Sequence, residues 1–158
     1  MFNIGDKIVY PMHGAGVIRA IEEKKILGET KEYYIMKLPF SDMCLMAPVK
    51  SQDGTNLRTI SDRKTFEEAL KVLKTEPTEM DSNWNRRYRD NIDRLRTGDV
   101  FEVAGVVRNL VMSDKTRHLS QGERKLMNDA KLILLSEFIL VMDVSAEEAE
   151  RAIMEAIG

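Results

Sequence analysis

Residues that bind metals or act as nucleophiles are scarce in this sequence. It contains one cysteine, Cys44, and two histidines, His13 and His118. A single cysteine cannot form an internal disulfide, which fits a reducing compartment, and neither histidine has further ligands at metal-site spacing. The sequence also lacks a phosphate-loop motif and a nucleophile-elbow motif. We therefore expect no metal, no cofactor and no enzymatic activity.

Long hydrophobic runs are missing as well. No stretch approaches the roughly 18 apolar residues that a membrane-spanning helix needs, and the first residues do not combine a basic segment with an apolar core. We expect a cytoplasmic protein without a membrane anchor. Nothing in the sequence requires more than a monomer.

An overall positive charge is also absent, because the formal net charge is −2 at pH 7. Domains held to nucleic acid mainly by bulk electrostatics are usually basic. Positive charge is nevertheless concentrated between Trp84 and Arg96, where arginines outnumber acids, whereas the segment from Glu137 to the C-terminus is acidic. Any contact with DNA is therefore expected to be local and to need help from a protein partner.

The hydrophobic period changes near residue 60. Before it, turn residues separate five short β-type segments, at residues 7–10, 17–21, 33–38, 44–47 and 57–60. After it, apolar residues recur at helical spacing in five segments, which begin near Asp62, Trp84, Val100, Ser120 and Ser145, the third ending near Ser113. The sequence predicts a small, strongly bent sheet or barrel at residues 1–60 and an all-α bundle of about five helices at residues 61–158.

Trp84, the sole tryptophan, opens the arginine-rich helix after a polar run at residues 81–83 that supplies its candidate N-cap. A flat apolar ring beside guanidinium groups suits the minor groove, where arginines anchor to phosphates while the ring intrudes on a base step. The competing interpretation is a core residue, because Trp84 shares an ordinary apolar helix stripe with Tyr88, Ile92 and Leu95. Periodicity alone favours the core, with the arginines on a solvated face.

Two further segments are suited to binding. The strand at residues 43–48 is short, apolar and closed by Pro48, which sheets tolerate at edges or strand ends. It is either an edge strand able to pair with a partner's sheet or an internal strand. The fourth helix carries Arg124 and Lys125 in its first turn, where the helix dipole and free N–H groups favour a phosphate. A capped, solvated helix end is the competing interpretation.

Four motifs follow one another along the chain. They are Gly5 to Pro11 with His13-Gly14, then Gly28 to Tyr34, then Asn83 to Tyr88, and finally Leu119 to Arg124. Taken together, they resemble the CarD family of bacterial transcription regulators, which includes the CdnL proteins. The resemblance spans essentially the whole chain, in order and at family-like spacing.

The resemblance implies an N-terminal Tudor-like (SH3-like) β-barrel that binds the β subunit of RNA polymerase, partly by strand pairing. It places Lys24 and the strand residues Met43, Cys44, Leu45 and Met46 on the polymerase-facing surface. Family members can carry arginine at the position of Met46. Methionine cannot form the salt bridge that arginine could, whereas backbone pairing does not need one.

The resemblance further implies that the helical domain contacts promoter DNA. Trp84 matches an exposed family tryptophan that wedges into the minor groove at the upstream edge of the transcription bubble. Arg86, Arg87, Arg89 and Arg124 match positions that carry basic residues against DNA phosphates. A ligand that prefers the melted promoter shifts the equilibrium toward melting, so we expect stabilisation of the open complex with little base-specific readout.

Other functions remain compatible with the residues themselves. One is an autonomous DNA-binding repressor that reads DNA with a helix-turn-helix, and another is a protein-interaction module with Trp84 in its core. A third is the repair-coupling class, whose polymerase-binding domain resembles residues 1–60. That class carries a helicase motor, and no phosphate-loop sequence is present here.

Overall fold

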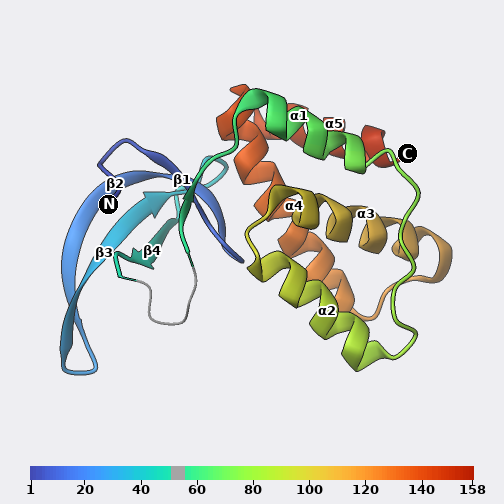
Figure 1. The fold of residues 1–158 in the computed structure, drawn as a ribbon, viewed down its shortest axis with the longest axis horizontal. Helices are drawn as coiled ribbons and strands as arrows, with labels where there is room; N and C mark the ends of the chain where they lie inside the picture. Colours follow the sequence, from blue (N-terminus) through green and yellow to red (C-terminus); the bar gives the residue numbers. More distant parts are fainter. Residues whose placement is uncertain (51–55) are drawn as a thin grey trace.

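The computed structural model describes residues 1–50 and 56–158. Within these ranges an antiparallel sheet precedes a group of five helices (Figure 1). The predicted order of a β domain followed by an α domain is therefore confirmed. No helix in the described ranges is long and apolar enough to cross a membrane.

The sheet contains five antiparallel strands in the order β4-β3-β2-β1-β5. The strands are β1 (Lys7–Tyr10), β2 (Gly14–Ile26), β3 (Glu29–Lys37), β4 (Cys44–Pro48) and β5 (Arg58–Thr59). β2 and β3 curve strongly and project beyond β4 as a two-stranded arm (Figure 1). Among the described residues, β4 and β5 form the two edges of the sheet.

β2 is much longer than the predicted segment at residues 17–21. Its distal part, residues 22–25, is charged and mostly exposed, so it lacks the alternation of apolar and polar residues that marks a half-buried strand. These residues pair with the distal part of β3, and a Leu27-Gly28 turn with positive φ at both residues closes the hairpin. Backbone pairing rather than burial holds this arm.

The helices each begin at an N-cap side chain that accepts a hydrogen bond from a first-turn N–H. They are α1 (Arg63–Val72), α2 (Trp84–Arg96), α3 (Val100–Arg117), α4 (Gln121–Met142) and α5 (Ala146–Ile157), capped by Asp62, Asn83, Asp99, Ser120 and Ser145. The polar run 81–83 thus supplies its last residue as the cap of α2. α3 continues to Arg117, whereas the sequence predicted an end near Ser113. The apolar pattern missed the last turn because that turn is polar.

Among the described residues, buried apolar side chains form two separate cores, one in each domain. The sheet core consists of Ile8, Ile18, Tyr34, Met36 and Ala47. The helical core is larger and lies around α3 and α4. Each of these helices buries ten residues, which is more than the single apolar stripe that a surface helix buries. Two cores with different periods explain why two domains are recognisable in the sequence, although their limits at residues 60 and 61 stay a prediction.

The sheet packs directly against the helical domain through α4 (Figure 1). The Ala15 N–H donates to Ser136 Oγ at 2.8 Å, and Arg58 of β5 donates to both carboxylate oxygens of Glu137 at 2.9 and 2.8 Å. Glu137 belongs to the acidic C-terminal segment of the sequence, yet it is buried. The fold brings it an arginine partner from 79 residues away.

Candidate nucleic-acid interface

Trp84 is the first residue of α2, and 40% of its surface is exposed. Its ring stacks on Tyr88, with centroids 5.0 Å apart and planes 11° from parallel. The indole Nε1–H donates to Ser120 Oγ at 3.1 Å. The ring therefore lies outside the helical core, and the core interpretation of Trp84 is wrong.

Ser120 joins the starts of two helices. As the N-cap of α4, its Oγ accepts the N–H of Glu123 at 3.2 Å, and the same oxygen accepts the indole N–H of Trp84. The indole also lies close to Gly122, where an added Cβ would come within 3.3 Å of the ring. Ser120 and Gly122 together limit where the tryptophan can lie.

Arg87 lies beneath this surface, with only 6% of it exposed. Its Nε and Nη2 donate to the two carboxylate oxygens of Glu123 at 2.8 and 3.0 Å, and Nη1 donates to the carbonyls of Asp81 and Ser82. The hydrogen bonds from Arg87 lower the pKa of Glu123. Because Glu123 and the carbonyls occupy the guanidinium, the expected phosphate contact of Arg87 is replaced by a buried link between α2 and α4.

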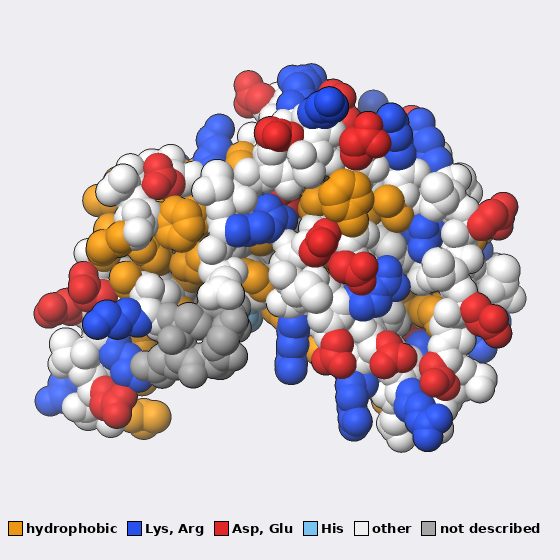
Figure 2. All heavy atoms as spheres, in the orientation of Figure 1, with side chains coloured by type: hydrophobic (Ala, Val, Ile, Leu, Met, Phe, Trp, Pro, Cys, Tyr) orange, Lys and Arg blue, Asp and Glu red, His pale blue; other side chains and the backbone are white. Residues whose placement is uncertain are grey.

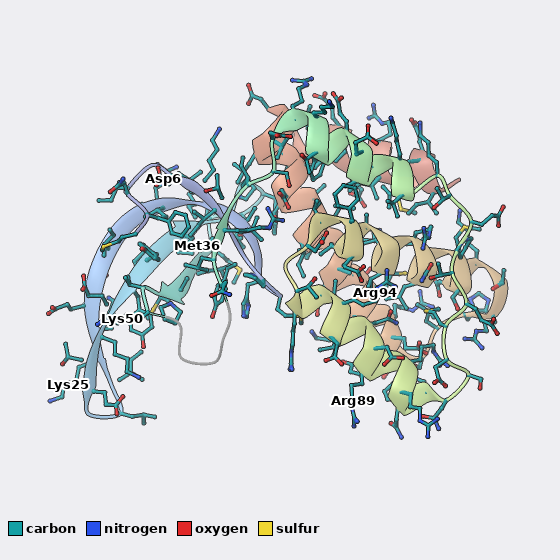
Figure 3. The ribbon with its side chains drawn as sticks, in the orientation of Figure 1. Asp6, Lys25, Met36, Lys50, Arg89 and Arg94 are labelled. Atoms are coloured by element: carbon teal, nitrogen blue, oxygen red, sulfur yellow. The ribbon has the colours of Figure 1, made fainter. Side chains whose placement is uncertain are left out.

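Arg86, Arg89 and Arg124 are exposed. The Arg89 side chain extends from α2 away from the protein (Figure 3), and Lys and Arg side chains project below α2 with acidic groups between them (Figure 2). Arg124, in the first turn of α4, donates to Asp114 of α3 at 3.0 Å. An exposed ion pair of this kind contributes little net free energy, so it leaves Arg124 able to exchange Asp114 for a phosphate.

The starts of α2 and α4 lie together at the hydrogen bond between Trp84 and Ser120. Both helix starts present backbone N–H groups at the positive end of a helix dipole. An aromatic ring between two helix N-termini, on helices that carry exposed guanidinium groups, can enter a base step while those groups bind the phosphate backbone. Among the described residues, no group of three or more His, Cys, Asp or Glu side chains could hold a metal ion.

A second candidate surface is the outer side of β4, which pairs only with β3 in the described part of the sheet. Two backbone hydrogen bonds fix the alternation of the ladder: the Leu38 N–H donates to the Met43 carbonyl at 3.2 Å, and the Val49 N–H donates to the Glu32 carbonyl at 3.1 Å. Antiparallel pairing alternates residue by residue, so Cys44 and Met46 turn their N–H and C=O groups to the unpaired side. Of the two interpretations of this strand, the edge strand is confirmed.

The predicted polymerase-facing residues are accessible to different degrees. Met43 and Met46 are 66% and 40% exposed, Cys44 is exposed, and Leu45 is half-buried. Lys24 lies on the β2 arm opposite Lys31, beyond the end of β4, and is ion-paired with Glu22 at 2.9 Å. The structure therefore gathers four of the five residues on β4 and its entry, whereas β3 separates Lys24 from them.

Ser120 and Glu123 are site residues that the sequence did not reveal as partners of Trp84 and Arg87. Their capping-box spacing is a sequence signal for the start of α4. The pairs Trp84 with Arg87 and Ser120 with Glu123 share a three-residue spacing, and each contact joins residues 36 positions apart. The equal three-residue spacing at the starts of α2 and α4 is the sequence pattern that could have indicated that these two helix starts contact each other.

Two family models match the chain, one in each domain. The model described as the CarD C-terminal domain matches residues 68–154, and the CarD-like/TRCF RID domain matches residues 2–61. The chain is also 35% identical over 148 residues to the protein of Bacillus subtilis (strain 168) named "Putative transcription factor YdeB", with 94% of this chain and 97% of that protein covered. The N-terminal match implies an interaction with RNA polymerase. The chain belongs to the CarD family of transcription factors.

Proposed function

We propose that this protein binds the β subunit of RNA polymerase through its sheet and promoter DNA through its helical domain, and so stabilises the open complex. Trp84 wedges into the minor groove at the upstream edge of the bubble. The observation that carries the proposal is the placement of this ring, partly exposed and held by Ser120 and Tyr88 beside two helix starts.

The unpaired side of β4 supports the polymerase contact. A partner strand along it would meet the backbone groups of Cys44 and Met46 that face away from β3, with Met43 and Leu45 beside them. Lys24 would contact polymerase separately, from the β2 arm. Strand addition draws its affinity from main-chain hydrogen bonds. It therefore tolerates methionine at position 46, where a salt bridge is unavailable.

The charge distribution supports a DNA contact that depends on polymerase. Arg86 and Arg89 of α2 and Arg124 of α4 are exposed cations, with Arg87 as buried support, but the whole chain carries a net charge of −2. Phosphate contacts supply most sequence-independent affinity for DNA, and a few of them on an acidic protein give weak binding. Tethering to polymerase raises the effective concentration of the DNA surface at the promoter.

The upstream edge of the bubble is the site where a wedge costs least. Unstacking an intact duplex step costs a few kcal/mol, and melting has already removed part of that cost at the edge. A protein that binds the melted promoter better than the closed one shifts the equilibrium toward the open complex. The wedge therefore acts on the melting step without reading the sequence.

The geometry favours this function over the alternatives. An autonomous repressor must bind DNA tightly without polymerase, which a net charge of −2 disfavours. A pure protein-interaction module with Trp84 in its core is disfavoured because the ring is 40% exposed.

Permanganate reactivity of thymines at the upstream edge of the bubble tests the placement of the wedge. We expect the wild type to raise this reactivity in a polymerase–promoter complex, because an inserted ring unstacks the neighbouring base. Trp84→Ala should bind polymerase with unchanged affinity and leave the reactivity at its level without added protein. Equal reactivity with both proteins would overturn the wedge.

A further inference from the structure

Glu137, in the second half of α4, lies at the junction between the two domains. Only 4% of it is exposed, and its carboxylate accepts four hydrogen bonds. Arg58 Nη1 and Nη2 donate at 2.9 and 2.8 Å, and the backbone N–H and Oγ–H of Ser61 donate at 2.8 and 2.7 Å. The donors belong to β5 and to the short segment between β5 and α1.

Arg58 extends this junction to a third element. Its Nε donates to the Gly98 carbonyl, between α2 and α3, at 2.8 Å. Gly98 has a φ of +71°, and an added Cβ there would lie 2.8 Å from Pro11 Cγ. Glycine is thus required where the turn between β1 and β2 contacts the helical domain.

A second hydrogen bond connects α4 to the sheet one residue earlier. Ser136 Oγ accepts the Ala15 N–H at 2.8 Å and donates to the Ile133 carbonyl at 2.7 Å. Gly14 precedes Ala15 with a φ of +118°, and its added Cβ would lie 3.0 Å from Ser136 Oγ. Residues 136 and 137 of α4 therefore contact both the start of β2 and the end of the sheet.

Such a junction is unlike the default contact between two domains, which permits relative motion. A charge-assisted two-point hydrogen bond has a preferred geometry, and buried polar networks favour one arrangement because any other leaves groups unpaired. Both Arg58 hydrogen bonds to Glu137 would be lost if the sheet rotated against α4.

We propose that Glu137 is a positioning residue that fixes the angle between the sheet and the helical domain, so that polymerase bound at β4 places Trp84 at one position on the promoter. The consequence for the promoter rests on the proposed function, whereas the fixed angle does not. One helix carries both ends of the arrangement, because the α4 cap Ser120 binds Trp84 and Glu137, in the second half of α4, binds Arg58 of the sheet.

The length of α4 makes the angle matter. Seventeen residues separate Ser120 from Glu137, which corresponds to about 25 Å of helix, so a tilt of about 10° at Glu137 moves the Trp84 end by about 4 Å. Successive base pairs are about 3.4 Å apart. A small rotation at the junction would therefore shift the ring by a whole base step.

The chain offers its own pair of probes for the interdomain geometry. Trp84 is the single tryptophan and Cys44 the single cysteine, both are exposed, and they lie in different domains. With an energy acceptor attached to the Cys44 thiol, time-resolved energy transfer from Trp84 gives a distance distribution for the free protein. We expect one narrow distribution for the wild type and a broader one for Glu137→Gln.

Two further variants keep this measurement decisive. Arg58→Lys keeps the charge but removes the two-point geometry, and it should broaden the distribution even if Glu137→Gln folds poorly by circular dichroism. Glu155→Gln removes an exposed carboxylate of α5 and should leave the distribution unchanged. A folded Glu137→Gln or Arg58→Lys protein with the wild-type distribution would overturn the fixed angle.

The lifetime of the promoter open complex tests the consequence. Glu137→Gln should bind polymerase as the wild type does. Its extension of the open-complex lifetime should be smaller than that of the wild type by about fivefold or more, because coupling between two sites usually amounts to at least about fivefold. A broadened distance distribution with an unchanged lifetime would overturn the positioning role. If the wild type itself fails to extend the lifetime, the proposed function fails while the distance measurement still decides the angle.

Discussion

One hydroxyl oxygen, Ser120 Oγ, both caps α4 and holds the indole of Trp84. Ser120→Ala removes both contacts. We expect it to lower the free energy of unfolding by about 1 kcal/mol, the usual cost of a lost N-cap, and to increase the quenching of Trp84 fluorescence by aqueous quenchers. Chemical denaturation and quenching titrations measure the two effects.

Ser145→Ala is the matched control for this prediction. Ser145 caps α5 by accepting the Glu148 N–H at 3.1 Å, so its removal should cost a similar free energy without changing the quenching of Trp84. Identical quenching of Trp84 in wild type and Ser120→Ala would show that the hydroxyl does not hold the ring.

Glu123 gives the Trp84 site a dependence on pH. Hydrogen bonds from Arg87 lower the pKa of Glu123 below the ordinary glutamate value of about 4.3. Such a carboxylate stabilises the fold above the ordinary pKa and loses this contribution as the pH falls through its lower folded-state pKa. The free energy of unfolding should therefore fall more steeply below about pH 4.3 in wild type than in Glu123→Gln. Parallel pH profiles from denaturant titrations would contradict this prediction.

Leu27 has a left-handed backbone conformation that is unfavourable for a leucine side chain. It is 99% exposed and has a φ of +52° in the β2–β3 turn, before Gly28. A left-handed conformation costs an ordinary side chain about 1 kcal/mol, whereas asparagine tolerates it, and Asn-Gly is the preferred pair in such turns. Leu27→Asn should raise the free energy of unfolding by up to about 1 kcal/mol, and Leu27→Ala should not. Denaturant midpoints below that of the wild type would contradict this.

At the scale of single elements, β4 has two sides that can be distinguished by proline. Met46→Pro removes an N–H on the unpaired side, and Leu45→Pro removes one that the alternation assigns to β3. We expect Leu45→Pro to cost about 1–3 kcal/mol of stability through a lost ladder bond. Met46→Pro should change thermal unfolding little but weaken polymerase binding. Unchanged polymerase affinity of Met46→Pro would exclude strand pairing at this edge.

The elements differ in how well the sequence predicts them. The helices were predictable because N-caps such as Asn83 and Ser120 combine with apolar periodicity. The distal β2 arm and the last turn of α3 were not, because neither is ordered by a buried apolar stripe. Pattern analysis reports burial, so it misses parts of an element that are held by backbone hydrogen bonds alone.

At the scale of the whole molecule, contacts between distant residues escaped prediction. The local hydrophobic pattern distinguishes the two domains but does not predict the hydrogen bonds that join them. These bonds connect Ala15 to Ser136, 121 residues apart, and Arg58 to Glu137, 79 residues apart. Similarly, the sequence identified Trp84 and the exposed arginines as candidates but could not tell Arg87 from them. That distinction needs Glu123, which only the folded chain places beside Arg87.

We propose that Trp84 acts on the promoter while the sheet holds polymerase, and one measurement tests this role directly. That measurement is the lifetime of an open complex with bacterial RNA polymerase, without added protein, with wild type and with Trp84→Ala. We predict that wild type lengthens the lifetime and that Trp84→Ala binds polymerase equally well without lengthening it. An equal extension by both proteins would contradict a DNA wedge at Trp84.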